Sequence, residues 1–554
     1  MASICLTETI AMAKDSKTPL YVTSLDAQKA FDVVDHGILR SRVFYSGMTG
    51  LGWTLIDDLH VNCNENVRWK GSLSKPYSVS QGVRQGGVLS TILYKKYLDP
   101  LLQEMELAGT GTFIGDIYLG IPTCADDVLL LSNEKTQMQA MLRRTYEYSQ
   151  QNKYTLHPQK STTSQLCRKT KLSSRPDVLY LGEEEITKAE EFTHLGLQWN
   201  EARSRPIITE RIQTAYKTAY MLIGRGIHGS NGINPAVSSK VMTSQVLPRL
   251  THGLEAVMLP KYELHKIDNV YRSLLRQQQG LPERTALEAI HLLNGTLPAT
   301  ANIHYKMLLT FGSITRLDSN NPLKRLAIRQ LTLENSSYSW FVELRNIATD
   351  YDINLVKVWK QEWNKLSWKK YVKVSILTRW HGILLEGASN KSSLNLLDVS
   401  LCHAGKAHPI WEVTKLNLKE TRRAVTRAKI LTGVYPFETR AYKMNKTENP
   451  TCKLCFLEDE DTNHFINKCP ALQQARSAWM EQIVAKLKEA NIGVNANERT
   501  CIIVNGSYGG MLCNNQWCFK FSSLCNGLVE DLHLLRNSLL LRTEEVVPLR
   551  TNIR

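Results

Sequence analysis

The residues best suited to chemistry are acidic and fall in two separate groups. In YVTSLDAQKAF an apolar run ends at Asp26 and a helix is expected to follow, so this carboxylate lies where a strand edge opens to solvent. In IYLGIPTCADDVLLLS two apolar runs flank Asp126 and Asp127, which predicts a hairpin with adjacent carboxylates at its tip. Carboxylates in such apolar surroundings are costly unless they are paired or bound to a metal ion.

Three carboxylates that converge, with no basic residue beside them, suit Mg²⁺, which prefers oxygen ligands and completes its coordination with water and substrate phosphates. Two such ions roughly 4 Å apart can deprotonate a 3′-hydroxyl, hold an α-phosphate and neutralise a leaving pyrophosphate. A simpler interpretation stays open from these two groups alone. The pair of aspartates is then turn chemistry, and Asp26, Asp32 and Asp35 are acids at the start of a helix.

A third element lies between the two acidic groups, in SVSQGVRQGGVLSTILYKKYLDPLL. Its glycines, Gly82, Gly86 and Gly87, let a ligand approach the backbone closely. Arg84 and Gln85 offer polar contacts, and an amphipathic helix is expected to follow them. The presence of this element between the acidic groups favours the chemical interpretation over the structural one.

The three elements in this order resemble motifs A, B and C of reverse transcriptases. The sequences DAQKAFDVVDH and GVRQGGVLS are most similar to those of the non-LTR, LINE-type retrotransposon class. The resemblance continues into YTLHPQKST, which is similar to motif D, and EFTHLGLQW, which is similar to the primer grip of motif E around Leu195 and Gly196. RLTHGLEAVM resembles the thumb of this class, so the resemblance covers residues 1 to about 260.

The resemblance implies a role for each matched residue. It makes Asp26, Asp126 and Asp127 the catalytic carboxylates that hold two Mg²⁺ ions, and Lys160 the residue that protonates pyrophosphate. The residues implied to contact the incoming deoxynucleoside triphosphate are Phe31, Arg84, Gln85 and Gly86.

Phe31 matches the bulky steric gate that rejects a ribose 2′-hydroxyl, although an ordinary core aromatic would look the same.

The sequence departs from the family pattern at three places. Cys124 replaces the usual aromatic residue before the two aspartates, Gly87 and Val88 replace a Cys-Pro pair, and His157 replaces a common asparagine. None of these departures removes a carboxylate.

The expected fold is an α/β palm of the right-hand polymerase type, an antiparallel sheet with packed helices, followed by a mostly α-helical remainder. The expected domains are a palm at 1–200, a helical thumb at 201–310, a basic helical nucleic-acid-binding region at 311–449, a CCHC zinc knuckle at 450–472 and a helical tail at 473–554. The family carries its fingers and an apurinic-like endonuclease upstream of motif A. Because only 25 residues precede Asp26, we expect a chain truncated upstream, with its fingers largely missing.

A cysteine and histidine cluster in PTCKLCFLEDEDTNHFINKCP has the spacing C-x2-C-x8-H-x4-C. Cys452, Cys455, His464 and Cys469 would bind one structural Zn²⁺ in a tetrahedron, although free cysteines can also cluster by chance. The cluster resembles the C-terminal motif of LINE-type proteins. The four consecutive acids between its halves, at 458–461, would repel a phosphate backbone, so we interpret the knuckle as a structural clip.

The charge of the chain favours a polyanionic partner. The 554 residues carry a formal net charge of +16, and residues 321–449 hold 22 Lys and Arg against 11 Asp and Glu, together with six of the eleven tryptophans. Phosphate contacts are expected from Arg422, Arg423 and Arg427, and base stacking from tryptophans. The alternatives are a solvated basic face and a helical core stripe of tryptophans.

A nucleic-acid partner is expected rather than a membrane, because no apolar stretch reaches the length of a membrane helix. Twelve cysteines in so long a chain suit a reducing compartment, so we expect the nucleus and cytoplasm rather than secretion.

The leading hypothesis is an RNA-directed DNA polymerase, a nucleotidyltransferase that extends a DNA 3′ end on an RNA template in a target-primed reaction. A catalytically silent nucleic-acid-binding remnant is the alternative. An endonuclease is disfavoured because no PD...D-x-K pattern follows the cysteine cluster.

Overall fold

The structure is a computed structural model that describes residues 1–167, 178–229, 232–360, 363–412, 414, 417–507 and 516–545. The chain divides into two compact units. Unit 1 comprises Met1–Ile208, Gly253–Leu259 and Met307–Lys365, and unit 2 comprises Thr209–His252, Pro260–Lys306 and Leu366–Arg554.

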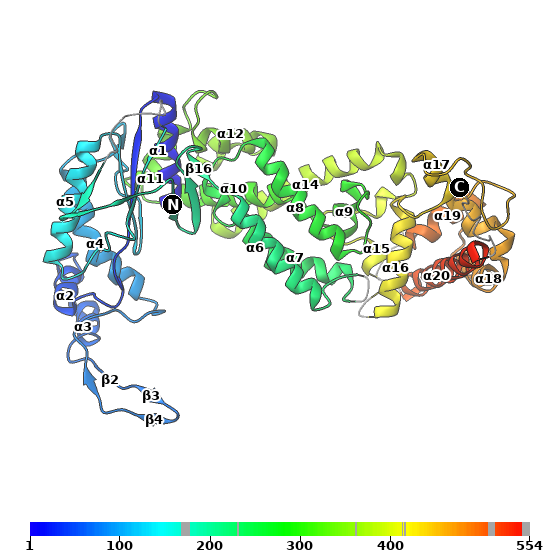
Figure 1. Ribbon diagram of the computed structural model, residues 1–554, viewed down its shortest axis with the longest axis horizontal. Coiled ribbons are helices and arrows are strands. Elements are labelled where there is room, and N and C mark those ends of the chain that lie inside the picture. The colour runs from blue at the N-terminus through cyan, green and yellow to red at the C-terminus, as the bar shows by residue number, and fades with distance from the viewer. Residues whose placement is uncertain are drawn as a thin grey trace, which may run out of the picture. The chain divides into compact units, whose positions relative to one another are not determined.

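A five-stranded sheet with the strand order β13-β10-β1-β9-β8 forms the centre of unit 1 (Figure 1). Its strands are β1 (Leu20–Leu25), β8 (Thr123–Cys124), β9 (Asp127–Ser132), β10 (Thr162–Leu166) and β13 (Thr187–Lys188). The sheet is mixed rather than wholly antiparallel as predicted, because β10 and β13 run parallel while the other pairs are antiparallel. A parallel pair needs a long connection, and the chain makes the separate hairpin of β11 (Tyr180–Leu181) and β12 (Glu184–Glu185) between these two strands.

Strand β9 is buried on both faces of this sheet. Val128 and Leu130 belong to a hydrophobic cluster with residues of the neighbouring helices, and Leu129 and Leu131, which point to the opposite face, are 0% exposed. The helices of this cluster are α2 (His36–Tyr45), α3 (Gly50–Asp58), α4 (Ser90–Leu107) and α5 (Lys135–Gln151). Burial on both faces explains why the sequence reads as the uninterrupted apolar run VLLL.

Shorter strands make the remaining sheets of unit 1. A three-stranded sheet contains β14 (Glu191–His194), β15 (Leu197–Asn200) and β16 (Arg205–Pro206). An exposed hairpin leaves the body of the unit after α3 (Figure 1). The strands of this hairpin are β2 (Asn64–Glu65), β3 (Arg68–Trp69), β4 (Ser72–Leu73) and β5 (Tyr77–Ser78). A further hairpin pairs β6 (Phe113–Ile114) with β7 (Ile117–Tyr118).

A buried carboxylate joins the first helix of unit 1, α1 (Ala2–Ser16), to the start of α12 (Trp340–Asp350). Glu8 is 0% exposed, and its Oε1 accepts hydrogen bonds from the backbone N–H of Trp340 at 2.7 Å and from the Ser339 hydroxyl at 3.0 Å. Gln330 donates to Oε2. Glu8 therefore caps α12 from a distant part of the chain. The other helical elements of this part are η1 (Leu254–Ala256), α11 (Pro322–Gln330) and α13 (Leu355–Lys360).

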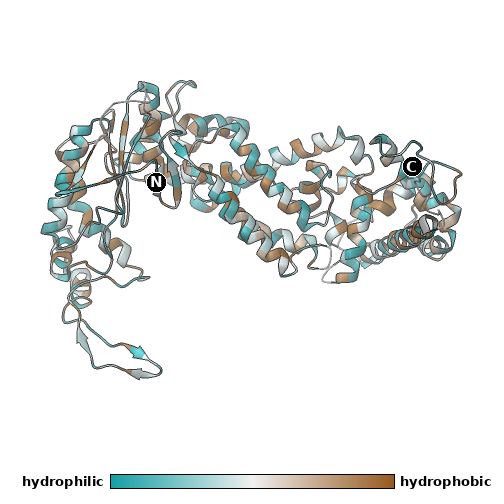
Figure 2. Ribbon diagram, in the orientation of Figure 1, coloured by the Kyte–Doolittle hydropathy of each residue, from teal (hydrophilic) through white to brown (hydrophobic). Residues whose placement is uncertain are grey.

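Unit 2 is built from amphipathic helices, along which Figure 2 shows hydrophobic and hydrophilic residues interspersed. The buried side chains of α8 recur at helical spacing: Ile267, Val270, Tyr271, Leu274 and Leu275. The helices that lie wholly or partly in this unit are α6 (Thr209–Gly224), α7 (Pro235–Thr251), α8 (Lys261–Gln278), α9 (Leu287–Asn294), α10 (Ala299–Thr315), α14 (Lys365–Ser389), α15 (Pro409–Glu412), α16 (Leu418–Leu431), α17 (Glu438–Lys443), α18 (Gln473–Glu489), α19 (Ala496–Asn505) and α20 (Gln516–Glu545).

The core of unit 2 brings the cysteine and histidine segment together with the last helix. Trp411, Phe465, Phe521 and Leu528 are buried in one hydrophobic cluster, in which α20 packs against both α16 and α18. The 3-10 turns η2 (Ser392–Leu394), η3 (Val399–Leu401) and η5 (Pro470–Leu472) and the π turn η4 (His464–Lys468) connect these helices. None of the described helices is long and apolar enough to cross a membrane.

We predict that Glu8→Ala loosens the contact between α1 and α12. The substitution leaves several buried donors without an acceptor, which costs about 1–3 kcal/mol for each unsatisfied group. Hydrogen exchange at the amides of Trp340 and Phe341 should then accelerate by at least about tenfold. The matched control Glu8→Gln keeps one acceptor oxygen and should exchange nearly as slowly as wild type.

Comparison of the wild-type protein with Glu8→Gln also tests the ionisation of Glu8 through the pH dependence of stability. Burial is the largest influence on Glu8 and raises its pKa above the usual glutamate value, despite the hydrogen bonds from Gln330 and Ser339 that lower it. A raised pKa in the folded state means that stability is lost as pH rises from about 4 through the folded value. As the pH rises through this range, the melting temperature of wild type should therefore fall relative to that of Glu8→Gln. Parallel plots of melting temperature against pH for the two proteins would contradict this account.

Candidate functional site

The two acidic groups of the sequence meet at one edge of the central sheet. Strands β1 and β9 pair antiparallel with Leu25 opposite Val128. Asp26, which follows β1 directly, therefore lies beside Asp127, which begins β9. Asp126 occupies the tip of the two-residue turn between β8 and β9, where it is exposed. The predicted hairpin with adjacent carboxylates is present.

The carboxylate of Asp127 is held by the turn between β14 and β15. The backbone N–H of Leu195 donates to Oδ2 at 2.9 Å, and Nδ1 of the buried His194 lies 3.7 Å from Oδ1. Leu195 (φ +49°) and Gly196 (φ +71°) form the two-residue turn with both φ values positive, a type I′ arrangement that matches the twist of a hairpin. Burial opposes ionisation of Asp127, but His194 and the Leu195 N–H outweigh it and lower the pKa.

The three carboxylates lie at one edge of the sheet, and their predicted role as Mg²⁺ ligands stays a prediction. In the described residues, the one group of three or more Cys, His, Asp or Glu side chains whose ligand atoms all lie within 4.8 Å of one another is the cysteine and histidine cluster. Asp127 accepts the hydrogen bond from the Leu195 N–H, whereas Asp126 is exposed at the tip of its turn. The aspartates share an edge without forming a closed cluster.

The segment that resembles motif D packs against Asp26. The backbone N–H of His157 donates to the carbonyl oxygen of Asp26 at 2.8 Å, and the N–H of Asp26 donates to the Ser161 hydroxyl at 3.1 Å. Lys160 lies between His157 and Ser161 in the sequence and is exposed. Its amine has no partner among the residues that the structure describes. Sequence reasoning missed the anchoring role of Ser161.

The glycine-rich segment also contacts the residues after Asp26. The Gln85 amide donates to Oδ1 of Asp32 at 3.0 Å. Gly82 has a φ of +98°, and a Cβ there would lie 3.1 Å from the carbonyl oxygen of Asp32, so this close approach requires glycine. Arg84 and Gly86 are exposed.

Phe31 is half-buried and stacks on Tyr94 of α4, with ring centroids 4.9 Å apart. This contact fixes the position of the ring on the helix that follows the glycine-rich segment.

Comparison with known proteins agrees with this arrangement. Residues 2–199 match the family model described as reverse transcriptase (RNA-dependent DNA polymerase). The part of the chain from residue 2 to 199 is thus similar to a reverse transcriptase domain. Its central sheet, acidic edge and glycine-rich segment all lie within the matched residues.

Relatives of this reverse transcriptase domain come from retrotransposable elements. The chain is 25% identical over 297 residues to the retrovirus-related Pol polyprotein from type-1 retrotransposable element R2 of Nasonia vitripennis, which covers 51% of the chain and 27% of the relative. It is 20% identical over 507 residues to the type-2 R2DM Pol polyprotein of Drosophila melanogaster, which covers 87% of the chain and 43% of the relative. The chain therefore spans less than half the length of these relatives.

A second candidate site lies in unit 2. Cys452, Cys455, His464 and Cys469 bring one ligand atom each to within 4.8 Å of the others. The two sulfurs of Cys452 and Cys469 are 4.0 Å apart, and the Cys455 sulfur lies 3.3 Å from Nε2 of His464. Hydrogen bonding from Cys469 lowers the pKa of Cys452, which favours the thiolate that a metal ion requires. The four predicted residues thus form a possible metal site.

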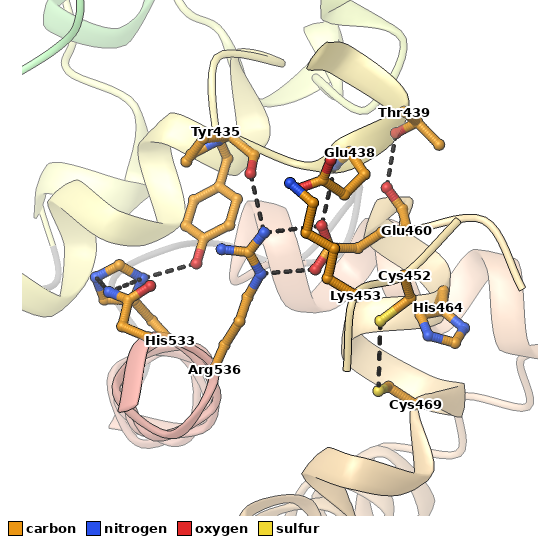
Figure 3. Close-up of polar contacts among 12 residues, drawn as sticks. Tyr435, Glu438, Thr439, Cys452, Lys453, Glu460, His464, Cys469, His533 and Arg536 are labelled. Atoms are coloured by element: carbon orange, nitrogen blue, oxygen red, sulfur yellow. Dashed lines mark hydrogen bonds and ion pairs between the residues drawn. The ribbon is translucent and has the colours of Figure 1, made fainter. Parts of the chain in front are cut away.

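The acidic residues between the halves of this cluster are mostly engaged within the protein. Oε2 of Glu458 lies 2.9 Å from the Lys468 amine and 3.6 Å from Nδ1 of His464. Glu460 is 3% exposed and forms a salt bridge with Arg536 of α20, with contacts of 2.6 and 2.8 Å (Figure 3). The expectation of four acids that face a phosphate backbone is therefore wrong for Glu460, whose charge is neutralised inside the unit.

Of the three arginines expected to bind phosphate, Arg422 alone is exposed. Arg423 is half-buried and pairs with Glu420 at 2.9 Å. Arg427 is 0% exposed, and its guanidinium donates to the Ser522 carbonyl oxygen at 3.1 Å and to the Ser522 hydroxyl at 2.9 Å. The expected phosphate contact therefore does not fit Arg427, because an amphipathic helix hides one of its basic residues against α20.

The tryptophans of the basic segment serve mainly as core residues. Trp340, Trp368 and Trp411 are each at most 1% exposed. Trp359 lies against Phe311, with ring centroids 5.8 Å apart. For these four residues the structure favours the core interpretation over base stacking.

We predict that Arg427→Ala acts on stability and not on phosphate binding. The change removes a fully buried guanidinium and its hydrogen bonds to Ser522, at a cost of about 2–4 kcal/mol. Thermal unfolding of the part of the chain that contains α16 and α20 should shift to lower temperature. Arg422→Ala is the matched control, because surface substitutions usually stay within about 0.5 kcal/mol. Equal melting curves for the two variants would contradict the buried role.

Proposed function

We propose that the chain is an RNA-directed DNA polymerase that adds deoxynucleotides to a DNA 3′ end on an RNA template. The observation that carries this proposal is the shared sheet edge of Asp26, Asp126 and Asp127 inside a domain that matches the reverse transcriptase family. The relatives are Pol polyproteins of R2 elements, which supports target-primed copying of a retroelement transcript at nicked DNA.

The donor set at this edge suits magnesium. Its ligands are carboxylate oxygens, and Leu195 holds Oδ2 of Asp127, which leaves Oδ1 to coordinate. Two Mg²⁺ ions bound there would lower the pKa of the 3′-hydroxyl and neutralise charge on the phosphates. Ser161 and His157 fix the backbone of Asp26, so its side chain is presented from a defined position.

The remaining residues of the site receive roles that suit their contacts. Phe31, held by Tyr94, would exclude a ribose 2′-hydroxyl. The unpartnered amine of Lys160 would protonate the leaving pyrophosphate. The exposed Arg84, with Gln85 and the backbone at Gly86, would contact the incoming nucleotide.

A catalytically silent nucleic-acid-binding protein is the second candidate. Its support is the formal net charge of +16, which favours a polyanionic partner whether or not the acidic edge is catalytic. Primer extension separates the two candidates directly.

We further propose a helical thumb at 201–310, a basic nucleic-acid-binding region at 311–449 and a zinc knuckle at 450–472, followed by a helical tail at 473–554. Location in the nucleus and cytoplasm is supported by the cysteines, since none of the eleven in the described residues forms a disulfide with another described cysteine.

We predict that Asp126→Asn lowers primer extension on an RNA template by about 100-fold or more, because the loss of a direct ligand should exceed the 10- to 100-fold effects of residues around a metal site. The assay uses a DNA primer, deoxynucleoside triphosphates and Mg²⁺. Asp58→Asn is the matched control, since this aspartate of α3 is exposed and has no partner among the described residues. Extension by Asp126→Asn at the rate of the control would refute the catalytic assignment.

We propose that the cysteine and histidine cluster binds one structural Zn²⁺. All four positions of a tetrahedron are filled by protein, so no site remains for a substrate. Glu458 near Nδ1 of His464 orients the ring so that Nε2 faces the three sulfurs.

The corresponding prediction is one zinc ion per chain in wild type and a loss of that ion in Cys452→Ser. Elemental analysis of the purified protein measures the content, and removal by a chelator should lower the melting temperature because metal binding contributes to folding. Cys124→Ser, which changes an exposed cysteine outside the cluster, should keep the metal. Full zinc content in Cys452→Ser would rule out the ligand set.

A further inference from the structure

A cavity of about 550 Å³ opens in unit 2 between one face of α7 and one face of α14. The residues that α7 contributes lie on one face of the helix: Ala236, Ser239, Lys240, Thr243, Ser244 and Leu247. Those of α14 also lie on one face: Lys369, Lys373, Ile376 and Leu377. The rest of the lining comes from the segment 294–302, Tyr305 of α10, Tyr271 of α8, Gly405 and Ala407. The volume lies within the range of about 300–1,000 Å³ that encloses small organic groups.

The rim of this cavity is cationic. Lys240, Lys369 and Lys373 are exposed, and none has a hydrogen-bond or ion-pair partner among the described residues. No aspartate or glutamate belongs to the described lining. Three unpaired cations around one opening, without a carboxylate to neutralise them, fit the phosphates of a nucleic acid strand.

The interior of the cavity offers an aromatic face and an unsatisfied acceptor. Tyr305 is half-buried and has no ring or hydrogen-bond partner in the part of the chain that the structure describes. Asn294 is 5% exposed, and its Nδ2 donates to Oε1 of Gln278 at 3.1 Å while its buried Oδ1 has no donor. A planar group with an N–H edge would stack on the ring and satisfy this oxygen. An unpaired nucleobase has both properties.

We propose that this cavity binds single-stranded RNA, with one unpaired base inside it against Tyr305 and the adjoining phosphates on Lys240, Lys369 and Lys373. The proposal rests on the proposed function, because it assigns a binding site to the template strand of that reaction. Ser244 favours RNA over DNA, since its hydroxyl donates to the Val241 carbonyl and keeps lone pairs for a ribose 2′-hydroxyl. A paired base cannot enter, so the site distinguishes a single strand from a duplex.

The test measures binding of the full chain to a fluorescent single-stranded RNA, to DNA of the same sequence and to the corresponding RNA duplex at several salt concentrations. Tyr305→Ala should weaken single-stranded RNA binding by about fivefold to more than a hundredfold, the effect of one lost base stack, and leave duplex binding unchanged. The double variant Lys369→Ala/Lys373→Ala should lower the slope of log K against log salt by about 1.4, because two phosphate contacts are lost.

Matched controls lie on the same unit outside the cavity. Lys261→Ala/Lys266→Ala removes two exposed lysines of α8, and Tyr220→Ala removes an exposed tyrosine ring of α6, all outside residues 311–449. If these controls weaken single-stranded RNA binding as much as the cavity variants do, or if the cavity variants bind as wild type does, the proposal fails. A loss that appears for DNA but not for RNA would also overturn it.

Primer extension separates this proposal from the catalytic one. Asp126→Asn should keep the RNA affinity and salt slope of wild type, since Asp126 does not line the cavity. Absence of extension in wild type with the Tyr305 effect intact would refute the polymerase and leave the cavity assignment standing. Extension by wild type together with unchanged RNA binding in Tyr305→Ala would do the reverse.

Discussion

The antiparallel pairing of β1 with β9 is the constraint on which the central sheet of unit 1 depends. It places the residue after Leu25 and the residue before Val128 next to each other, and this juxtaposition fixes where Asp26 and Asp127 stand. Side chains on both faces of β9 are buried, so a slip of one residue in this register would move both the core and the carboxylates. The hydrophobic core of unit 1 and the position of its acidic edge are therefore specified by one set of backbone hydrogen bonds.

Unit 2 depends on a different kind of contact. The salt bridge between Glu460 and Arg536 connects the segment that carries the cysteines to the last described helix. Around it, the Tyr435 hydroxyl lies 2.7 Å from Nδ1 of His533, and the backbone N–H of Glu438 donates to Glu460 at 3.0 Å (Figure 3). A buried ion pair is costly to break because either partner alone would be an uncompensated charge. The cysteine and histidine cluster is thus built into the unit rather than attached to it.

Much of the central sheet of unit 1 could be predicted from sequence because its signals are local. The apolar run VLLL, which has turn residues on both sides, indicates a buried strand. The two aspartates at its start indicate an acidic hairpin tip. The metal-ligand spacing of the four residues from Cys452 to Cys469 is also local, and the structure brings their ligand atoms together. The role of Lys160, the steric gate at Phe31 and the domain boundaries stay predictions.

The features that sequence did not reveal depend on contacts between distant segments. Glu458 to Asp461 look alike as four consecutive acids, yet Glu460 is buried only because Arg536 lies 76 residues further along the chain. Arg427 looks like its neighbours on a basic helix, and only its packing against Ser522 distinguishes it. The donor to Asp127 is a backbone N–H, which every residue except proline has, so the residue type does not reveal this contact. Composition cannot report such partners, because it does not say which segments meet.

The use of the Leu195 backbone as the donor to Asp127 determines which sequence changes this hairpin tolerates. A peptide N–H is present whatever side chain the residue carries, so substitution at this position leaves the donor in place as long as the turn keeps its positive φ values. A deletion or insertion of a single residue between β14 and β15 would instead carry the N–H away from the carboxylate. Over evolutionary time the length of this hairpin is therefore more constrained than the side chain at position 195, which need only suit a turn with positive φ values.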